Sequence, residues 1–457
     1  MSTALLATKF FAPPRPAHGI ARPRLTQRLD AGLSRKLTLV CAAAGFGKST
    51  LVSQWAQDCP VPSAWLSLDV EDRDASRFLS YLVASLEQVS HTVGAGLGAM
   101  LAGSPPASAE TVLTLLVNQL AQSPGKLVLV LDDYHLAASA AVNAALVFLI
   151  DHMPAQLHLV IASREEPAIA LGRLRVDGQL AEIRQPDLRF GLEEATAFLN
   201  PDGAVPLSAA QVQALEARTE GWISGLKLAA ISLHQHQDPA HFIAAFTGSH
   251  RFVQDYLMEE VLHQQPDAVQ AFLLRTSLLD RLCGPLCDAV LQAQGAEQIL
   301  HRLEQAGLFI VPLDAERRWY RYHHLFADLL RQRLAQQEAA GPLHRRASQW
   351  YEAQGLELEA FHQATQAQHM ADAVRLIEGK GMPLYFRGHT GPVVHWLSSL
   401  APEALNRQPF LWVAYSWSLL FAGQPAEVAE KLIAAQAALQ SSPHGAQAGD
   451  TQGQMAV

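Results

Sequence analysis

A loop of small residues at positions 42–49, AAAGFGKS, most constrains the fold of this chain. It follows the apolar run LTLVC at 37–41 and precedes the helix-like LVSQW at 51–55. A strand, a small-residue loop and a helix start, in this order, are what a phosphate cradle requires. Backbone N–H groups can then turn inward around phosphates, and the helix N-terminus adds its positive end. The pattern therefore predicts a P-loop within an α/β sheet.

Each position of this loop has an expected role in holding a nucleotide. Lys48 is predicted to meet the β- and γ-phosphates, and the Ser49 hydroxyl to ligate Mg²⁺. Ala42 stands where the strict pattern has its first glycine, which is a mild change provided that the residue does not need a positive φ. A glycine-rich loop that binds nothing is the alternative. The predicted nucleotide-binding residues of the loop are Ala44, Gly45, Phe46, Gly47, Lys48, Ser49 and Thr50.

Two further runs of large aliphatic residues end in charged side chains. LVLVL at 127–131 precedes Asp132 and Asp133, which is a Walker B arrangement. Parallel strands present their C-terminal ends to the ligand crevice, so Asp132 is expected beside Ser49 at Mg²⁺, and Asp133 could orient an attacking water. Arg164 follows the run at 159–163 and could touch the γ-phosphate and so distinguish ATP from ADP. The predicted catalytic residues are Lys48, Asp132, Asp133 and Arg164, with Ser49 and Asp132 at the metal.

Length and composition bound the class of protein. With 457 residues, 49% of them hydrophobic and 17% charged, the chain has material for two to four globular domains. A net charge of −9 argues against a broad basic surface for nucleic acid. Neither a membrane span nor a secretion signal is evident, and a cytoplasmic location is expected. Cys283 and Cys287 have no matching pair elsewhere, so core packing is expected there rather than a metal.

The pattern of apolar runs predicts a doubly wound parallel sheet followed by helical domains. Strands are expected at 36–41, 63–68, 126–131, 157–163 and 180–183. Short helices are expected after Phe190, with a turn at 200–203. A helix, a strand at 308–313, a strand at 319–322 and a further helix then indicate a winged-helix module, with an ordinary α+β connector as the alternative.

Helices at 343–354, 358–368, 370–379, 393–400 and 411–422 are expected as consecutive pairs, as in tetratricopeptide-like repeats. The predicted domains are an N-terminal segment at 1–21, the ATPase at 22–190, a small helical domain at 191–250, a winged helix at 251–340, the start of a helical solenoid at 341–440 and a disordered tail at 441–457.

Two weaker candidates for nucleotide contact lie outside the sheet. Arg22 precedes the first helix, where its side chain or its backbone could reach the base, and a solvated basic turn is the alternative. His323 and His324 lie where the predicted hairpin meets its last helix, and an imidazole there could close onto a diphosphate. A structural histidine is the more common outcome on chemistry alone.

With these motifs in place, nearly the whole chain resembles the large ATP-binding regulators of the LuxR type, a group of STAND-class signal-transduction ATPases of which the maltose-regulon activator is the best known. The resemblance implies the order ATPase, helical domain, winged helix, solenoid sensor and C-terminal helix-turn-helix. It also favours His323 as a nucleotide contact, with His324 as its rival. The matching stretches are LATKF at 6–10, RPRL at 22–25, AGFGKSTL at 44–51, AWLSLD at 64–69, LDDYH at 131–135, ASR at 162–164, EGW at 220–222, FLLRTS at 272–277 and YRYHHLFADLL at 320–330.

The chain departs from the family pattern at two places. The helical domain of this class usually carries Gly-x-Pro with its proline against the adenine, whereas here Gly221-Trp222-Ile223 puts isoleucine at that position. The resemblance also implies a longer solenoid and a helix-turn-helix that we do not find in these residues, so direct DNA binding is not expected from them.

The resemblance implies a switch that binds ATP or ADP with Mg²⁺ and hydrolyses ATP slowly. ADP would hold a closed monomer, while ATP and a small-molecule inducer on the solenoid would permit self-association and activation of transcription. A nucleotide-binding scaffold and a metabolic ATPase are the alternatives. Intact Lys48, Ser49 and Asp132 argue against a scaffold with a dead nucleotide site, and the lack of an evident acceptor pocket or further catalytic base argues against the metabolic ATPase.

Overall fold

A computed structural model describes residues 5–16, 19–101, 108–200, 207–233, 239–248, 250–337, 339–379 and 382–441. These residues fall into two compact units. The first runs to Pro266 and adds 301–312 and 322–329, and the second comprises 267–300, 313–321 and the residues from 330 onward.

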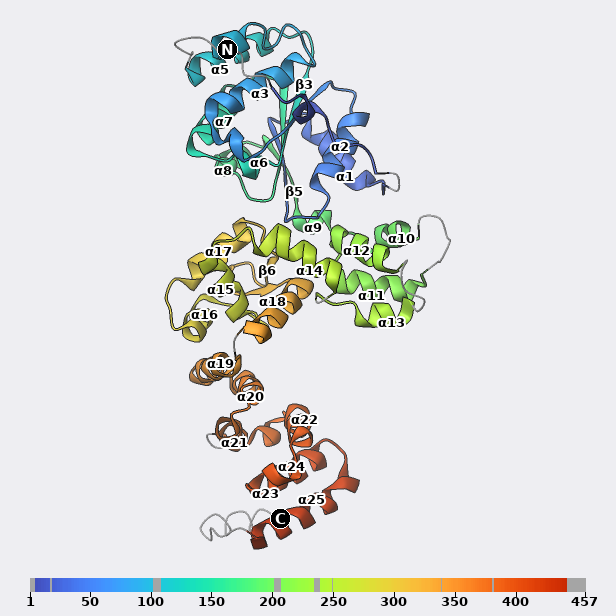
Figure 1. Cartoon of the computed structure of the whole chain (residues 1–457), viewed down its shortest axis with the longest axis vertical. Coiled ribbons are helices and arrows are strands. Elements are labelled where there is room, and N and C mark those ends of the chain that lie inside the picture. The colour runs from blue at the N-terminus through green and yellow to red at the C-terminus, as the bar shows by residue number, and fades with distance from the viewer. Residues whose placement is uncertain are drawn as a thin grey trace. The chain divides into compact units, whose positions relative to one another are not determined.

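A five-stranded, fully parallel sheet forms the centre of the first unit, with strand order β2-β3-β4-β1-β5 (Figure 1). All five predicted strands are present. Cys41 is in register with Ser163, so the chain leaves β1 and β4 at the same edge of the sheet. The strands are β1 (Leu37–Cys41), β2 (Ser63–Ser67), β3 (Leu127–Asp132), β4 (Leu157–Ser163) and β5 (Leu180–Arg184).

Helices cover both faces of this sheet, as the apolar runs predicted. Every residue of β1, β3 and β4 is buried, which is expected of strands covered on both sides. In Figure 1, α1 (Pro23–Gly32) and α2 (Lys48–Asp58) lie on one side, and α3 (Ala75–Glu87) and α7 (Ala140–His152) lie on the other. The other elements of this region are η1 (Ala7–Phe10), η2 (Val70–Arg73), α4 (Leu97–Leu101), α5 (Ala109–Ala121), α6 (Tyr134–Ala137), α8 (Leu171–Val176) and α9 (Gln185–Leu188).

After Phe190 the chain is helical, as expected. The helix at 251–262 divides into the α-helix α14 and the π-helical turn η3. Glu220 and Gly221 end α11 with φ angles of 51° and 68°, and a side chain at Gly221 would meet the Phe190 carbonyl oxygen at 2.5 Å, so glycine is required there. The predicted turn at 200–203 lies largely outside the described residues. The elements are α10 (Leu192–Leu199), α11 (Ala209–Thr219), α12 (Ile223–Leu233), α13 (Pro239–Ala245), α14 (Arg251–Leu257) and η3 (Met258–Leu262).

A helical segment with a two-stranded sheet follows, in the order predicted for a winged helix. The strands β6 and β7 pair with each other and are shorter than the sequence suggested. The elements are α15 (Asp267–Thr276), α16 (Gly284–Leu291), α17 (Ala296–Gln305), β6 (Ile310–Pro312), β7 (Tyr320–Tyr322) and α18 (His324–Gln337).

The remainder of the described chain is entirely helical. The five helices predicted after residue 341 are present, with α19 packed on α20, and α20 on α21. Two helices, α23 and α25, were not predicted, and the predicted tail from residue 442 on lies outside the described residues. None of the helices in the described ranges has the length and apolar character that a membrane crossing requires. The elements are α19 (Gly341–Ala353), α20 (Glu357–Gln366), α21 (Met370–Glu378), η4 (Leu384–Arg387), α22 (Thr390–Ser399), α23 (Pro402–Asn406), α24 (Phe410–Phe421), η5 (Pro425–Glu427) and α25 (Val428–Ser441).

Candidate functional site

The small-residue loop connects the end of β1 to the start of α2, where the sequence placed a P-loop. Gly45 and Gly47 both have φ angles of 76°, a region that favours glycine. Ala42 does not take a positive φ, so the replacement of glycine at that position introduces no backbone strain. Phe46 is buried, whereas Thr50, in the first turn of α2, is exposed.

Lys48 lies buried within the loop. Its Nζ donates to the Ala43 carbonyl oxygen at 3.0 Å. Burial lowers the pKa of this ammonium to about 8, with Arg164 adding to the effect and Asp133 opposing it. A buried cation with one carbonyl partner is suited to a negatively charged ligand, because such a ligand would supply the missing countercharge.

Ser49 and Asp132 meet directly, from α2 and the end of β3. The Ser49 hydroxyl donates to Asp132 Oδ1 at 2.8 Å. Burial, followed by the neighbouring Asp133, raises the pKa of the Asp132 carboxyl to about 6. A hydroxyl and a carboxylate are ligands that Mg²⁺ accepts. The described residues contain no group of three or more His, Cys, Asp or Glu side chains that could hold a metal, so water and phosphate oxygens would supply the other ligands of Mg²⁺.

Asp133 follows Asp132 in the left-handed conformation, with a φ of 53°, and begins α6. Its charge raises the pKa of both Lys48 and Asp132, so Asp133 lies close enough to both side chains to belong to the same site. A non-glycine residue held at positive φ is often found at functional sites.

Arg164 follows β4 at the same sheet edge, and its guanidinium is engaged by the π-helical turn. Nη2 donates to Glu260 Oε2 at 2.8 Å, and Nη1 to the Glu260 carbonyl oxygen at 3.2 Å. π-helical turns are rare and occur frequently at functional sites. This partner could not be predicted from the residues alone, because a π turn has no recognisable residue pattern.

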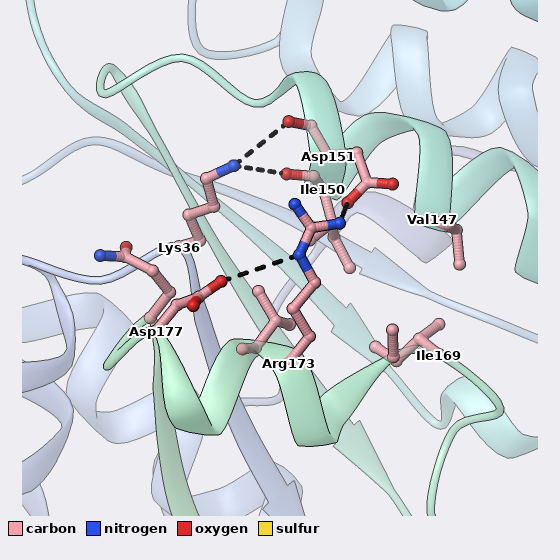
Figure 2. Close-up of a pocket in the computed structure, with 10 residues that line it drawn as sticks. Lys36, Val147, Ile150, Asp151, Ile169, Arg173 and Asp177 are labelled. Atoms are coloured by element: carbon pink, nitrogen blue, oxygen red, sulfur yellow. Dashed lines mark hydrogen bonds and ion pairs between the residues drawn. The ribbon is translucent and has the colours of Figure 1, made fainter.

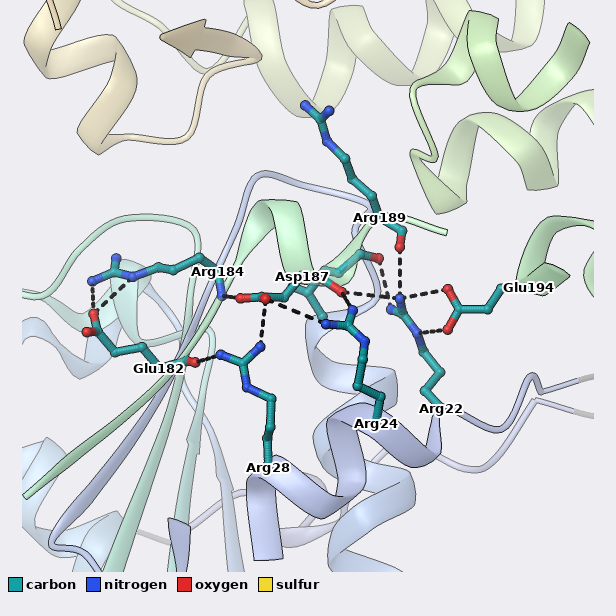
Figure 3. A network of polar contacts seen from close by, with 9 residues as sticks. Arg22, Arg24, Arg28, Glu182, Arg184, Asp187, Arg189 and Glu194 are labelled. Atoms are coloured by element: carbon teal, nitrogen blue, oxygen red, sulfur yellow. Dashed lines mark hydrogen bonds and ion pairs between the residues drawn. The ribbon is translucent and has the colours of Figure 1, made fainter. Parts of the chain in front are cut away.

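The Arg22 guanidinium is committed to the segment that leads from β5 to α10 (Figure 3). It donates from Nε to Glu194 Oε1 at 2.9 Å, from Nη1 to the Leu188 carbonyl oxygen at 2.8 Å and from Nη2 to the Arg189 carbonyl oxygen at 3.0 Å. The alternative of a solvated basic turn is wrong for this side chain, which is buried. With the guanidinium engaged in this way, the backbone is the part of Arg22 that could still meet a base.

The start of α12 packs directly against the P-loop. Trp222 Nε1 donates to the Ala44 carbonyl oxygen at 3.0 Å, and the Ser224 backbone N–H donates to the Gly45 carbonyl oxygen at 3.0 Å. A Cβ at Gly47 would lie 2.9 Å from Ile223 Cδ1, so the isoleucine expected near the adenine lies against the loop. Sequence reasoning missed Trp222, although a tryptophan between two glycines before an apolar helix marked the position.

His323 is fully buried beside this contact. Its Nε2 lies 2.9 Å from the Thr219 carbonyl oxygen, and its ring packs edge-on against Trp222 and Phe309. Burial lowers the pKa of the imidazole to about 4. A carbonyl oxygen can only accept, so Nε2 carries the proton, and Nδ1, which has no partner among the described residues, is an acceptor. The predicted contact with a diphosphate therefore requires a different placement of this ring. His324 is exposed and lies beside Glu220.

A separate cavity of about 90 Å³ lies at the opposite edge of the sheet, where β1 and β5 begin (Figure 2). Lys36 donates to the Ile150 carbonyl oxygen there, and Arg173 pairs with Asp151 and Asp177. These charges satisfy one another, and the cavity is not part of the P-loop site.

Residues 258–341 match a family described as the MalT winged helix domain. The serine/threonine-protein kinase PknK of Mycobacterium tuberculosis H37Rv is 33% identical over 412 residues, which is 89% of this chain and 37% of that protein. The HTH-type transcriptional regulator MalT of Vibrio cholerae is 31% identical over 422 residues, which is 90% of this chain and 46% of that protein. The Walker-type ATPase paby2304 of Pyrococcus abyssi has a TM-score of 0.49 at 16% identity, over 70% of this chain and 99% of that chain. The chain spans less than half the length of these two curated relatives.

Proposed function

The chain is MalT-like over nine-tenths of its length, and from this we propose that it is the ATP/ADP-binding switch module of a transcriptional regulator of the STAND class. The observation that carries the proposal is the 2.8 Å hydrogen bond between Ser49 and Asp132, which joins the P-loop to the end of β3. The buried ammonium of Lys48 beside this pair supplies positive charge where phosphates would lie.

The side chains at the C-terminal edge of the parallel sheet would each bind a different part of the nucleotide complex. Lys48 and the loop would hold the phosphates, Ser49 and Asp132 would hold Mg²⁺, and Asp133 would orient a water. Bound ATP would supply the scissile γ-phosphate. Arg164, the proposed γ-phosphate contact, is held by Glu260 in the described arrangement, which is compatible with slow turnover.

The proposed cycle couples nucleotide state to assembly. ADP would favour a closed monomer, whereas ATP and an inducer on helices of the 341–440 segment would favour self-association and activation of transcription in the cytoplasm. The proposed domain limits remain 22–190 for the ATPase, 191–250 for the helical domain and 251–340 for the winged helix.

A second candidate is the sensory module of a protein-kinase signalling protein. A kinase and transcriptional regulators match about nine-tenths of this chain at similar identity, so the shared region is not specific to either output.

The test is to identify the nucleotide retained after gentle purification and to titrate Mg²⁺ with ATP or ADP by calorimetry. Lys48→Ala should lose binding of both nucleotides. Lys36→Ala is the matched control, because Lys36 lies at the opposite end of the same strand. If Lys48→Ala binds ATP within about threefold of the unaltered protein, the phosphate site is elsewhere.

A further inference from the structure

We propose that Trp222 positions the P-loop backbone for phosphate binding, so that the start of α12 is part of the machinery that recognises the phosphate chain. The inference rests on the proposed nucleotide site. The sequence predicted that the ATPase segment alone forms the phosphate-binding loop. The inference adds to it a positioning residue from the helical domain.

Two consecutive carbonyl groups of the loop are fixed by α12. The Ala44 carbonyl accepts from Trp222 Nε1, and the Gly45 carbonyl accepts from the Ser224 backbone N–H. Both bonds are 3.0 Å long and join segments that lie far apart in the sequence. The peptide planes of the loop are thus oriented from outside the loop.

Because the peptide bond is planar, the fixed direction of each carbonyl group also fixes the direction of the N–H group that follows it. In a trans peptide the C=O and the following N–H point in opposite directions. With the Ala44 and Gly45 carbonyls directed at α12, the N–H groups of Gly45 and Phe46 are directed away from it. Neither N–H has a hydrogen-bond partner within the described ranges, and Phe46 is fully buried, so these donors are available to an anion.

The indole is held rigidly enough to act as a support. Trp222 is fully buried, with its ring centroid 5.5 Å from that of Tyr256 and 5.2 Å from that of Phe309. A Cβ at Gly45 would lie 2.7 Å from Trp222 Nε1 and 2.5 Å from Ser224 Oγ, so glycine is needed for this close approach as well as for its φ. Tryptophan suits the position because it combines a large apolar ring with a single N–H donor.

The arrangement links the two segments thermodynamically. If α12 favours the phosphate-binding orientation of the loop, bound phosphate must favour the placement of α12 to the same extent. Trp222 would thereby report occupancy of the phosphate site to the helical domain.

The test uses the full chain and compares Trp222→Phe with Trp55→Phe. Phenylalanine keeps an aromatic ring but removes the N–H. Trp55 is the matched control, because it is also buried and its Nε1 donates to Asp30 Oδ1 at 2.8 Å, at the end of α2 remote from the loop. The probes are ADP, inorganic tripolyphosphate and adenosine, measured by calorimetry alongside urea unfolding.

For Trp222→Phe we expect the affinities for ADP and tripolyphosphate to fall by about three- to tenfold, the effect of one lost hydrogen bond. The affinity for adenosine should be unchanged, and Trp55→Phe should leave all three as they are. A replacement of Trp222 by benzothienylalanine, which has sulfur in place of the N–H, should reproduce the loss even if phenylalanine perturbs folding.

Three outcomes would overturn the positioning role: equal loss for adenosine and tripolyphosphate, equal loss in Trp55→Phe, or unaltered phosphate affinity in the benzothienylalanine protein. If the unaltered protein binds neither ADP nor tripolyphosphate, the nucleotide site and the positioning role both fall. If it binds both and the Trp222 variants match it, only the positioning role falls.

Discussion

The surroundings of Asp132 disfavour the charged form of its carboxyl group. Burial and Asp133 raise the pKa of its carboxyl to about 6, against an ordinary value of 3.8. Because the folded-state pKa lies above the unfolded one, the carboxylate lowers the free energy of unfolding above about pH 6, and this penalty is relieved as the pH falls toward 4. A residue kept at such a cost is a candidate for binding a cation.

We therefore expect Asp132→Asn to stabilise the fold while damaging the site. The amide oxygen can still accept from Ser49 without a buried charge, so the free energy of unfolding should rise by roughly 1–3 kcal/mol above pH 6. The gain should shrink below that pH, as measured by urea unfolding without nucleotide. Mg²⁺-dependent ATP binding should weaken and hydrolysis should stop. Lower stability together with normal hydrolysis would contradict both the electrostatic and the metal roles.

The ion pair of Arg164 with Glu260 leads to a second expectation. If Arg164 contacts the γ-phosphate, Glu260 competes with ATP for it but not with ADP. Glu260→Gln should then raise the affinity for ATP by about three- to tenfold and leave that for ADP unchanged. Glu259→Gln, on the exposed side of the same π-helical turn, is the control. Calorimetry that shows equal changes for both nucleotides would exclude this competition.

Among the secondary-structure elements, those defined by local pattern were predictable. The five strands followed from apolar runs, and the site residues at their ends followed from the rule that parallel strands direct their C-terminal ends to one edge. The π-helical turn at 258–262 was not predictable, since it depends on one extra residue in a helical turn. Trp222 and Glu260 escaped prediction because their partners lie far away in the sequence, and no local pattern encodes such contacts.

Arg22 shows how one side chain orders a connecting element. Its planar fork reaches Glu194 and the three consecutive backbone carbonyls of residues 187–189, so it fixes the segment from α9 to α10. Arg22→Lys keeps the charge but cannot serve all of these partners, and should lower the free energy of unfolding by about 1–3 kcal/mol. Arg24→Lys is the control, because that side chain is 65% exposed and should change stability by less than about 0.5 kcal/mol. Thermal unfolding of the two variants measures the difference, and equal shifts would contradict the ordering role.

Across the first compact unit, contacts between distant residues converge beside the P-loop. Trp222 meets a carbonyl 178 positions away, and His323 meets one 104 positions away. These contacts are formed by side chains that touch one another, since the rings of Trp222 and His323 have centroids 6.1 Å apart. A substitution of either residue is therefore expected to alter the conformation of the P-loop.

His323→Ala tests whether the contacts of His323 beside the P-loop favour bound ADP over bound ATP. If His323 stabilises the ADP-bound form, its removal should lower the affinity for ADP more than that for ATP, by about 1–2 kcal/mol, and should favour self-association with ATP. His324→Ala is the control, because that side chain is 64% exposed. Calorimetry with each nucleotide and light scattering with ATP give the two measurements.

Because the imidazole is neutral above its pKa of about 4, the ADP preference should be independent of pH between 6 and 8. Equal losses for the two nucleotides, or a larger effect from His324→Ala, would exclude His323 as the residue that favours ADP.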